Sequence, residues 1–349
     1  MMNRNTAYQC DVKRRSFLKL SGLLGLGAAG AALLPVSKAE AVLFGNKEYK
    51  VSTTRLAMGT FVAMTAIHAS RDEAENAIGL AFEEIERLSR LLSRYDSGSA
   101  VSHLNDTGVL ARGEVEVLEL VARSLYYHRQ TQGAFDITVK PLIDLYKERF
   151  ASGGKPSEAE IAALLPLIGS EHLRFAEGNI SFTRKNMGIT LDGIAKGYIV
   201  DRASEILSRN GVTNHLINAG GDIRTSGLAA KGKAWTVAIQ DPAKKKGYPD
   251  VVKMNNGAIA TSGDYEIYYD REKMFHHIVD SRTGHSPLLS TSVTVKAATV
   301  MDADALATSL CVMEPDAGIA LINAQPGLEC FLIGHDGKTR HSAGWHLSS

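Results

Sequence analysis

The sequence predicts an α+β domain in which helices pack on a mixed or antiparallel sheet. Helical and strand patterns are intermixed along residues 42–349 without a regular βαβ alternation. No GxGxxG motif opens a helix after a strand, which argues against a Rossmann domain. No Pro- or Ser-rich linker interrupts residues 50–345. A single domain with a substantial core is therefore expected.

The N-terminal segment has the pattern of an export signal. Arg14 and Arg15 stand together, and an apolar run rich in Gly and Ala follows from Leu20 to Leu34. This run is shorter than the roughly 20 residues that span a bilayer. Small residues at Ala39 and Ala41 suit cleavage after Ala41.

We therefore predict a twin-arginine signal peptide in residues 1–41 and the functional domain in residues 42–349. Twin-arginine signals carry folded proteins across the bacterial inner membrane, so we expect a periplasmic protein that meets the membrane only during export. An ordinary secretory signal, or an uncleaved anchor that keeps the protein at the inner membrane, remains the alternative.

The charge of the chain excludes one class of partner. Six of the 39 Lys and Arg residues and two of the 38 Asp and Glu residues lie in residues 1–41, so the remainder has a formal charge of −3. No block of aromatic residues is interleaved with Lys and Arg. Nucleic acid is therefore not an expected partner.

The cysteines indicate neither zinc binding nor redox chemistry, because no CxxC pair occurs. Cys10 would leave with the signal, and Cys311 and Cys330 lie in apolar stretches. Both are expected to be buried small hydrophobic residues. A disulfide between them stays open in an oxidising compartment.

The elements of residues 42–349 follow from periodicity and turn signals. Strand patterns flank a turn at Met58–Thr60 within residues 55–68, and a helix follows in which Ser70 and Glu73 form a capping box. Its apolar residues recur at helical spacing as far as Leu92. Further helices are predicted at about 115–131, 158–168 (capped by Ser157) and 195–209. Further strands are predicted at roughly 180–191, 214–218, 235–240, 264–270, 291–297 and 328–334.

The segment MDADALATS at 301–309 suggests a cation site. Asp304 and Thr308 are four residues apart in a helical stretch, so their oxygens share one helix face. Magnesium prefers oxygen ligands and completes its shell with water and substrate phosphate. Taken alone, such residues near a helix start are more often capping groups.

A second segment, GITLDGIAKGYIVD at 188–201, suggests phosphate binding. It leads through Asp192 and Gly193 into a helix that carries Lys196. Backbone amides at a helix start attract phosphate, and Lys196 could neutralise it. The GxxxxGK spacing of a Walker loop is absent.

Further segments place polar groups beside glycine: GAFDITVKP at 133–141, NAGGD at 218–222, ATSGDYE at 260–266 and HHIVDSRTG at 276–284. In an extended chain His276 and His277 point to opposite faces and would not chelate one metal together. One of them suits the role of a lone proton carrier, and a plain surface pair is the alternative.

These segments, in this order over nearly all of residues 42–349, resemble the ApbE family, the FAD:protein FMN transferases. The resemblance begins at AMGT, 57–60, passes through SRYDSGSAVSHLN, 93–105, and ends beyond DADALAT, 302–308. It implies a T-fold-like α+β fold and FAD as the bound substrate.

The resemblance also implies a site. Residues that match the family's flavin contacts are Met58, Tyr95, Ala134, Phe135, Asp136, Thr190, Lys196, His277 and Ile278. Lys196 would lie near the phosphates, and His277 with Ile278 matches the family's HIID-like motif. The metal would take a main-chain oxygen from Gly193 and side chains from Asp304 and Thr308.

One departure from the family concerns a carboxylate. Family members often read DLGGIAKG, whereas this chain reads TLDGIAKG, with Thr190 in place of that aspartate and Asp192 two places later. In an extended segment these positions share a face about 7 Å apart. Asp192 is therefore expected to reach the same space.

The implied reaction is the transfer of FMN from FAD to a threonine hydroxyl of an acceptor protein, with release of AMP. Magnesium and Lys196 would neutralise phosphate charge. His277 is the first candidate for the base and Asp192 the second. The acceptor would be a membrane or exported flavoprotein of an electron-transfer chain. The alternatives are a magnesium-dependent FAD pyrophosphatase and a periplasmic FAD-binding protein without catalysis.

Overall fold

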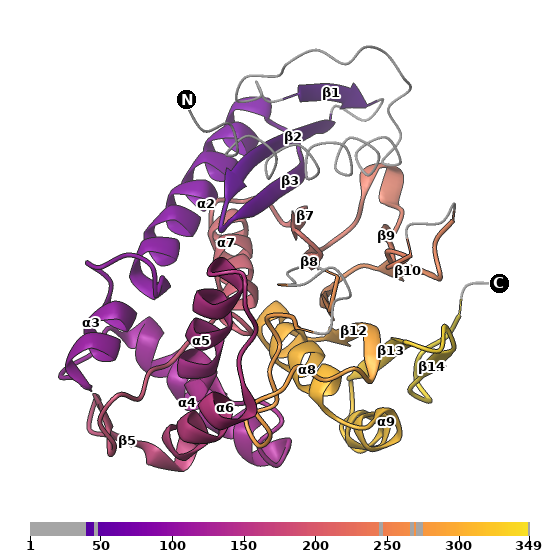
Figure 1. Ribbon diagram of the computed structural model, residues 1–349. Coiled ribbons are helices and arrows are strands. Elements are labelled where there is room, and N and C mark those ends of the chain that lie inside the picture. The colour runs from indigo at the N-terminus through magenta and orange to yellow at the C-terminus, as the bar shows by residue number, and fades with distance from the viewer. Residues whose placement is uncertain (1–39, 45–47, 244–246, 266–268, 270–274, 348–349) are drawn as a thin grey trace, which may run out of the picture. The chain divides into compact units, whose positions relative to one another are not determined.

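The structure is a computed structural model that describes residues 40–44, 48–243, 247–265, 269 and 275–347 (Figure 1). Residues 38–349 form one compact unit. The predicted signal lies outside the described residues except for its last two positions. Ala41, where cleavage is predicted, lies in β1 and pairs with Val51. Within the described ranges, no helix has the length and hydropathy needed to cross a bilayer.

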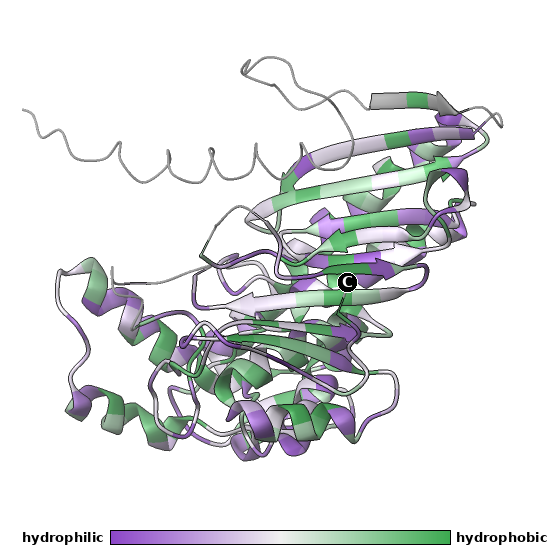
Figure 2. Ribbon diagram, turned by 90° about the vertical axis from the view of Figure 1, so that its right-hand side faces the viewer, coloured by the Kyte–Doolittle hydropathy of each residue, from purple (hydrophilic) through white to green (hydrophobic). Residues whose placement is uncertain are grey.

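The centre of the fold is an antiparallel sheet, which in the described ranges has nine strands in the order β1-β2-β3-β7-β8-β11-β12-β13-β14. Figure 2 shows these strands lying side by side. Their bounds are β1 Glu40–Phe44, β2 Glu48–Ala57, β3 Thr60–His68, β7 Asn214–Ala219, β8 Asp222–Ser226, β11 Gly257–Gly263, β12 Ser290–Ala297, β13 Glu329–Gly334 and β14 Thr339–His341. Smaller sheets pair β9 (Trp235–Ala238) with β10 (Val251–Met254), and β6 (Asn179–Phe182) with β4 (Val109–Leu110) and β5 (Leu173–Ala176).

Helices cover one face of the large sheet. α2 (Arg71–Leu92) packs on α7 (Ala195–Arg209), which packs on α8 (Val300–Val312), and α8 lies on β11 and β12. Figure 2 shows hydrophobic and hydrophilic residues on the same helices. The other helices are α3 Ala100–Thr107, α4 Val115–Gln130, α5 Lys140–Ala151, α6 Glu158–Leu164 and α9 Pro315–Asn323, with 3₁₀ turns η2 Ile137–Val139, η3 Leu165–Leu167, η4 Ser170–His172 and η5 Ala230–Gly232.

The strands place alternate residues in two cores, because successive side chains point to opposite faces of a sheet. Met64 and Ala66 of β3 lie in the core between the sheet and the helices. Ile67 packs on the other face, in a core that includes Trp235 of β9. The buried residues of α2 recur at helical spacing from Ala74 onward, so this helix gives a full apolar face to the first core.

The α+β class is confirmed, and several elements match the sequence prediction closely. The turn at Met58 and Gly59 joins β2 to β3, and α2, α4, α7 and α8 lie where helices were expected. Ser70 caps α2 through Glu73 N. The reciprocal half of the predicted capping box is wrong, since Ser70 N bonds instead to His68 Nδ1 at 3.1 Å.

Other boundaries differ for physical reasons. The predicted strand at 180–191 ends at Phe182, and the residues that follow form a loop whose backbone bonds to other segments. Of the strand predicted at 264–270, residues 266–268 and 270 lie outside the described residues. Asp264 and Tyr265 form a turn after β11 and not a strand, and Tyr265 folds back so closely that a Cβ on Gly263 would lie 2.4 Å from its ring. The helix predicted at 158–168 stops at Leu164, because Pro166 cannot supply a helical N–H.

Both cysteines of the domain are buried and unbridged, as the apolar surroundings suggested. Burial raises the pKa of the Cys311 thiol, and it raises the pKa of Cys330 to about 11. Neither thiol is poised to react near neutral pH.

Candidate active site

The crossing of α7 and α8 brings together the residues expected to hold a cation. Asp304 of α8 is buried, and its Oδ2 accepts a hydrogen bond from Gly197 N at 3.0 Å. The helices can meet this closely only at a glycine, because a Cβ on Gly197 would lie 2.4 Å from the carbonyl oxygen of Val300. Thr308, one turn after Asp304, lies against Gly193: a Cβ there would be 3.2 Å from both Thr308 Oγ1 and Cγ2.

These residues fit a hard cation such as Mg²⁺. Burial raises the pKa of the Asp304 carboxyl, a cost that a nearby positive charge offsets, and Lys196 already acts in that direction. Ser262 Oγ lies 3.3 Å from Thr308 Oγ1 and adds another oxygen. No cluster of three His, Cys, Asp or Glu residues is present in the described ranges. A single carboxylate with neutral oxygens leaves room for water and substrate phosphate, as Mg²⁺ requires.

Lys196 at the start of α7 has a partner that the sequence did not predict. Its Nζ lies 3.2 Å from Oδ2 of Asp222, a side chain that is only 1% exposed. Asp222 opens β8 directly after Gly220 and Gly221, which both have positive φ angles. The NAGGD motif therefore forms a tight turn that directs its carboxylate at the lysine. The sequence indicated NAGGD as a candidate functional segment, but it did not indicate that Asp222 pairs with Lys196.

The GAFD loop, residues 133–136, lies beside Gly193. Ala134 and Phe135 are buried, and the Phe135 ring lies 3.4 Å from the position that a Cβ on Gly193 would take. Asp136 caps η2 through Thr138 N, and its carboxylate also accepts hydrogen bonds from Ser170. This carboxylate stabilises the loop itself. A flavin contact by any of these residues stays a prediction.

The ion pair of His128 with Asp136, at 3.2 Å, makes the stability of this loop depend on pH. The hydrogen bond that His128 donates to the Asp136 carboxylate raises the pKa of His128. Burial raises the pKa of Asp136, but the bonds from His128 and Thr138 outweigh it and the net pKa is lowered. The stabilisation from His128 is fully present below about pH 6.5 and is lost as pH rises through its raised pKa. The stabilisation from Asp136 is fully present above about pH 4 and is lost as pH falls through its lowered pKa.

We therefore expect His128→Gln to lower the melting temperature most near pH 5.5, by about 2–4 °C, and less at pH 9. Scanning calorimetry of both proteins across this range measures the difference. His103→Gln, at an exposed position of α3, is the control and should show no such pH dependence. An equal effect of His128→Gln at both pH values would contradict the ion-pair assignment.

Met58 and Tyr95 are both at least partly exposed. Met58 has a φ of 51° in the β2–β3 turn, whose Thr60 packs against Gly220. Tyr95 is 68% exposed. Its hydroxyl accepts hydrogen bonds from Arg94, at 2.7 Å, and from Lys147.

The two adjacent histidines have different surroundings. His276 is 1% exposed, its Nε2 lies 2.9 Å from the Pro287 carbonyl oxygen, and Ser286 bonds to its main chain. Burial lowers its pKa. His277 is half-buried, and Ile278 packs into the main core. His276 therefore supports the loop, and His277 is the more accessible of the two.

Asp192 and Thr190 have different surroundings. Residues 183–194 form no strand, and Asp192 lies in a turn before α7. Thr190 is buried, and its Oγ1 accepts a hydrogen bond from Asp192 N at 3.2 Å. Asp192 is exposed and binds Arg94 instead.

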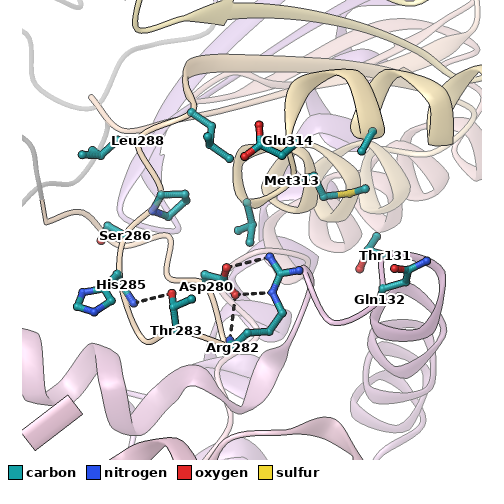
Figure 3. Close-up of a pocket in the computed structure, with 14 residues that line it drawn as sticks. Thr131, Gln132, Asp280, Arg282, Thr283, His285, Ser286, Leu288, Met313 and Glu314 are labelled. Atoms are coloured by element: carbon teal, nitrogen blue, oxygen red, sulfur yellow. Dashed lines mark hydrogen bonds and ion pairs between the residues drawn. The ribbon is translucent and has the colours of Figure 1, made fainter. Parts of the chain in front are cut away.

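A pocket of about 420 Å³ lies elsewhere, between the loop at 280–289 and the start of α9 (Figure 3). Arg282 and Asp280 form an ion pair in it, at 2.8 Å. None of the residues expected to contact flavin or metal lines it. The pocket is therefore separate from the candidate active site.

Comparisons with known proteins agree with one another. The sequence pattern of the ApbE family matches residues 58–332. The FAD:protein FMN transferase of Escherichia coli (strain K12) is 31% identical over 299 residues, which are 81% of this chain and 83% of that protein. The protein of the same name from Klebsiella pneumoniae (strain 342) is 30% identical over 297 residues, covering 80% and 83%.

Solved structures of the same fold are also similar. The ApbE protein of Thermotoga maritima superposes with a TM-score of 0.76 at 28% identity, over 84% of this chain and 97% of that one. The flavin transferase ApbE of Vibrio cholerae gives a TM-score of 0.73 at 28% identity, over 88% and 98%.

Proposed function

This chain belongs to the ApbE family and is therefore an FAD:protein FMN transferase, and we propose that it uses Mg²⁺ to modify a threonine of an exported flavoprotein. The observation that carries the Mg²⁺ proposal is the meeting of Gly193, Asp304 and Thr308 at the crossing of α7 and α8. The acceptor is proposed to be a membrane or exported flavoprotein of an electron-transfer chain.

The residues around this crossing have two roles toward the diphosphate of FAD: some bind phosphate oxygens, and others hold the cation. The ammonium of Lys196 binds phosphate oxygens, and Asp222 orients that ammonium. The amides expected to bind phosphate at the start of α7 instead donate within the protein, as Ala195 N does to Leu191 O and Gly197 N does to Asp304. Gly193, Asp304 and Thr308 would hold the cation. When bound, Mg²⁺ would neutralise charge on the phosphates.

Transfer exchanges one bond to phosphorus for another. The threonine oxygen of the acceptor attacks the phosphorus of the FMN half, the P–O bond to AMP breaks, and AMP leaves with the electron pair. His277 accepts the proton of the threonine hydroxyl as the new bond forms. FMN stays esterified to the acceptor through its phosphate.

A hydrolytic side reaction would use the same residues, with water in place of the threonine. The two reactions are distinguished by chromatography of the products after incubation with FAD, Mg²⁺ and acceptor. Transfer gives AMP and no free FMN, whereas hydrolysis gives both in equal amounts. AMP without labelled acceptor would favour the pyrophosphatase, and no AMP at all would favour a binding protein.

We also propose that the twin-arginine route delivers the protein to the periplasm, on the strength of Arg14 and Arg15. Changing both to lysine keeps the charge but removes the guanidinium groups, so most of the precursor should stay in the cytoplasm at full length. Cell fractionation and the mass of the product measure this. Arg4→Lys is the control. Unchanged delivery of the double variant would mean that another export route is used.

A further inference from the structure

Arg94 connects three segments that lie far apart in the sequence. Its side chain is only 3% exposed. Nε donates to Asp192 Oδ2 and NH1 donates to Asp144 Oδ1, both at 3.0 Å, while NH2 donates to Tyr95 OH at 2.7 Å. The planar guanidinium fixes the directions of these donors together. The side chain thus ties α5 and the loop that precedes α7 to the segment after α2.

Asn105, at the other end of the SRYDSGSAVSHLN segment, uses its side chain to bind the backbone of the loop that precedes α7. Its Nδ2 donates to Ile189 O at 3.0 Å, and its Oδ1 accepts from Ile189 N at 2.7 Å. Thr190 N donates to Ile137 O at 2.8 Å. The polar backbone groups that a strand would have paired are therefore satisfied by a side-chain amide and by η2.

This loop, residues 188–193, ends at the glycine expected to give its carbonyl oxygen to the cation. Thr308 and Phe135 both lie within 3.4 Å of the position that a Cβ on Gly193 would take. Asn105 fixes the loop four residues before Gly193, and Arg94 fixes it at Asp192, the residue immediately before. Hydrogen bonds within the segment, such as that from Asp192 N to Thr190 Oγ1, shape the loop, and these two side-chain contacts link it to the segment after α2.

We propose that Arg94 and Asn105 are positioning residues that hold loop 188–193 in the conformation that presents Gly193 to the cation, and that Asp192 is the anchor for Arg94 rather than the base. The inference rests on the proposed Mg²⁺ site. It also explains why this chain reads TLDGIAKG where family members often read DLGGIAKG, because a carboxylate at position 192, and not at 190, binds Arg94.

The test compares Arg94→Gln, Arg94→Lys, Asn105→Ala and Asp192→Asn with the unchanged protein. The first readout is hydrogen exchange of peptides covering 187–195 in ligand-free protein. The second is the Mg²⁺ concentration needed for half-maximal FAD binding, measured by calorimetry. Arg87→Gln is the matched control, because this arginine of α2 forms ion pairs with Glu84 and Glu116, away from the loop.

We expect faster exchange in 187–195 for all four variants and a Mg²⁺ requirement raised about 10- to 100-fold, the usual cost of losing a residue that orients a metal ligand. Arg94→Lys should not keep the exchange rate and Mg²⁺ requirement of the unchanged protein, because an ammonium cannot replace the several fixed donors of the planar guanidinium. Asp192→Asn should regain its transfer rate when Mg²⁺ is raised, which loss of a base would not allow.

The proposal would be overturned if the four variants showed hydrogen exchange in 187–195 and a Mg²⁺ requirement within twofold of those of Arg87→Gln. It would also be overturned if high Mg²⁺ did not restore the transfer rate of Asp192→Asn. If Arg94→Gln unfolds, the exposed Asp192→Asn tests the same contact from its other end. If the unchanged protein transfers no flavin, the proposed function fails, while the exchange experiment still decides whether these residues hold the loop.

Discussion

Asp304→Asn is expected to lower flavin transfer by about a thousandfold or more. Its buried carboxylate is the only charged group among the proposed cation ligands, and a bound metal contributes several kcal/mol to phosphoryl transfer. The amide can still accept the hydrogen bond from Gly197 N, so the α7–α8 crossing should stay intact. Initial rates of AMP release at saturating FAD and Mg²⁺ measure the effect, and thermal melting checks the fold.

The matched control is Asp302→Asn on the same helix. Asp302 binds Arg123 and Tyr127 of α4, so its loss should reduce stability and leave the metal requirement unchanged. Removing divalent cations with a chelator should stop the reaction of the unchanged protein, and adding Mg²⁺ should restore it. Full activity of Asp304→Asn, or of protein kept free of metal, would rule out this cation site.

His277→Ala is expected to slow transfer by about a hundred- to ten-thousandfold while FAD binding changes little. A base acts as the proton leaves in the transition state, so its loss reduces kcat rather than affinity. The pH profile should also lose the limb that reports the base. Single-turnover transfer and calorimetric FAD binding separate the two effects.

The neighbouring histidine is not a suitable control, because His276 is buried and bonded to Pro287 and Ser286. His285→Ala is a better one. This residue lies on the same loop, its side chain is 43% exposed, and it forms an ion pair with Glu158 at 3.3 Å. If His277→Ala merely raises the FAD concentration required, or matches His285→Ala, His277 binds substrate and is not the base.

The parts of the fold that the sequence predicted are those that local patterns determine. The apolar periodicity of α2 and the spacing of Asp304 and Thr308 depend on neighbours within a few residues. The strand predicted at 180–191 is confirmed only as far as Phe182, because the backbone partners of the later residues lie elsewhere: Asn105 bonds Ile189 across 84 positions. The order of strands in the sheet is likewise a property of distant pairings.

The candidate site shows the same division. The sequence identified Lys196 as a phosphate-binding candidate, but not that Asp222 holds it. Arg94 lies within the motif SRYDSGSAVSHLN, yet its partner Asp192 is 98 positions away. Single-sequence patterns carry no information about such contacts. Positioning residues are therefore harder to find than the residues they position.

The most direct test of flavin transfer is mass analysis of an exported candidate acceptor after incubation with the protein, FAD and Mg²⁺. We expect one threonine of the acceptor to gain the mass of FMN less one water, with one AMP released for each threonine modified. The acceptor with that threonine changed to alanine should gain nothing. Free FMN and AMP in equal amounts, with every tested acceptor unmodified, would contradict the transferase account.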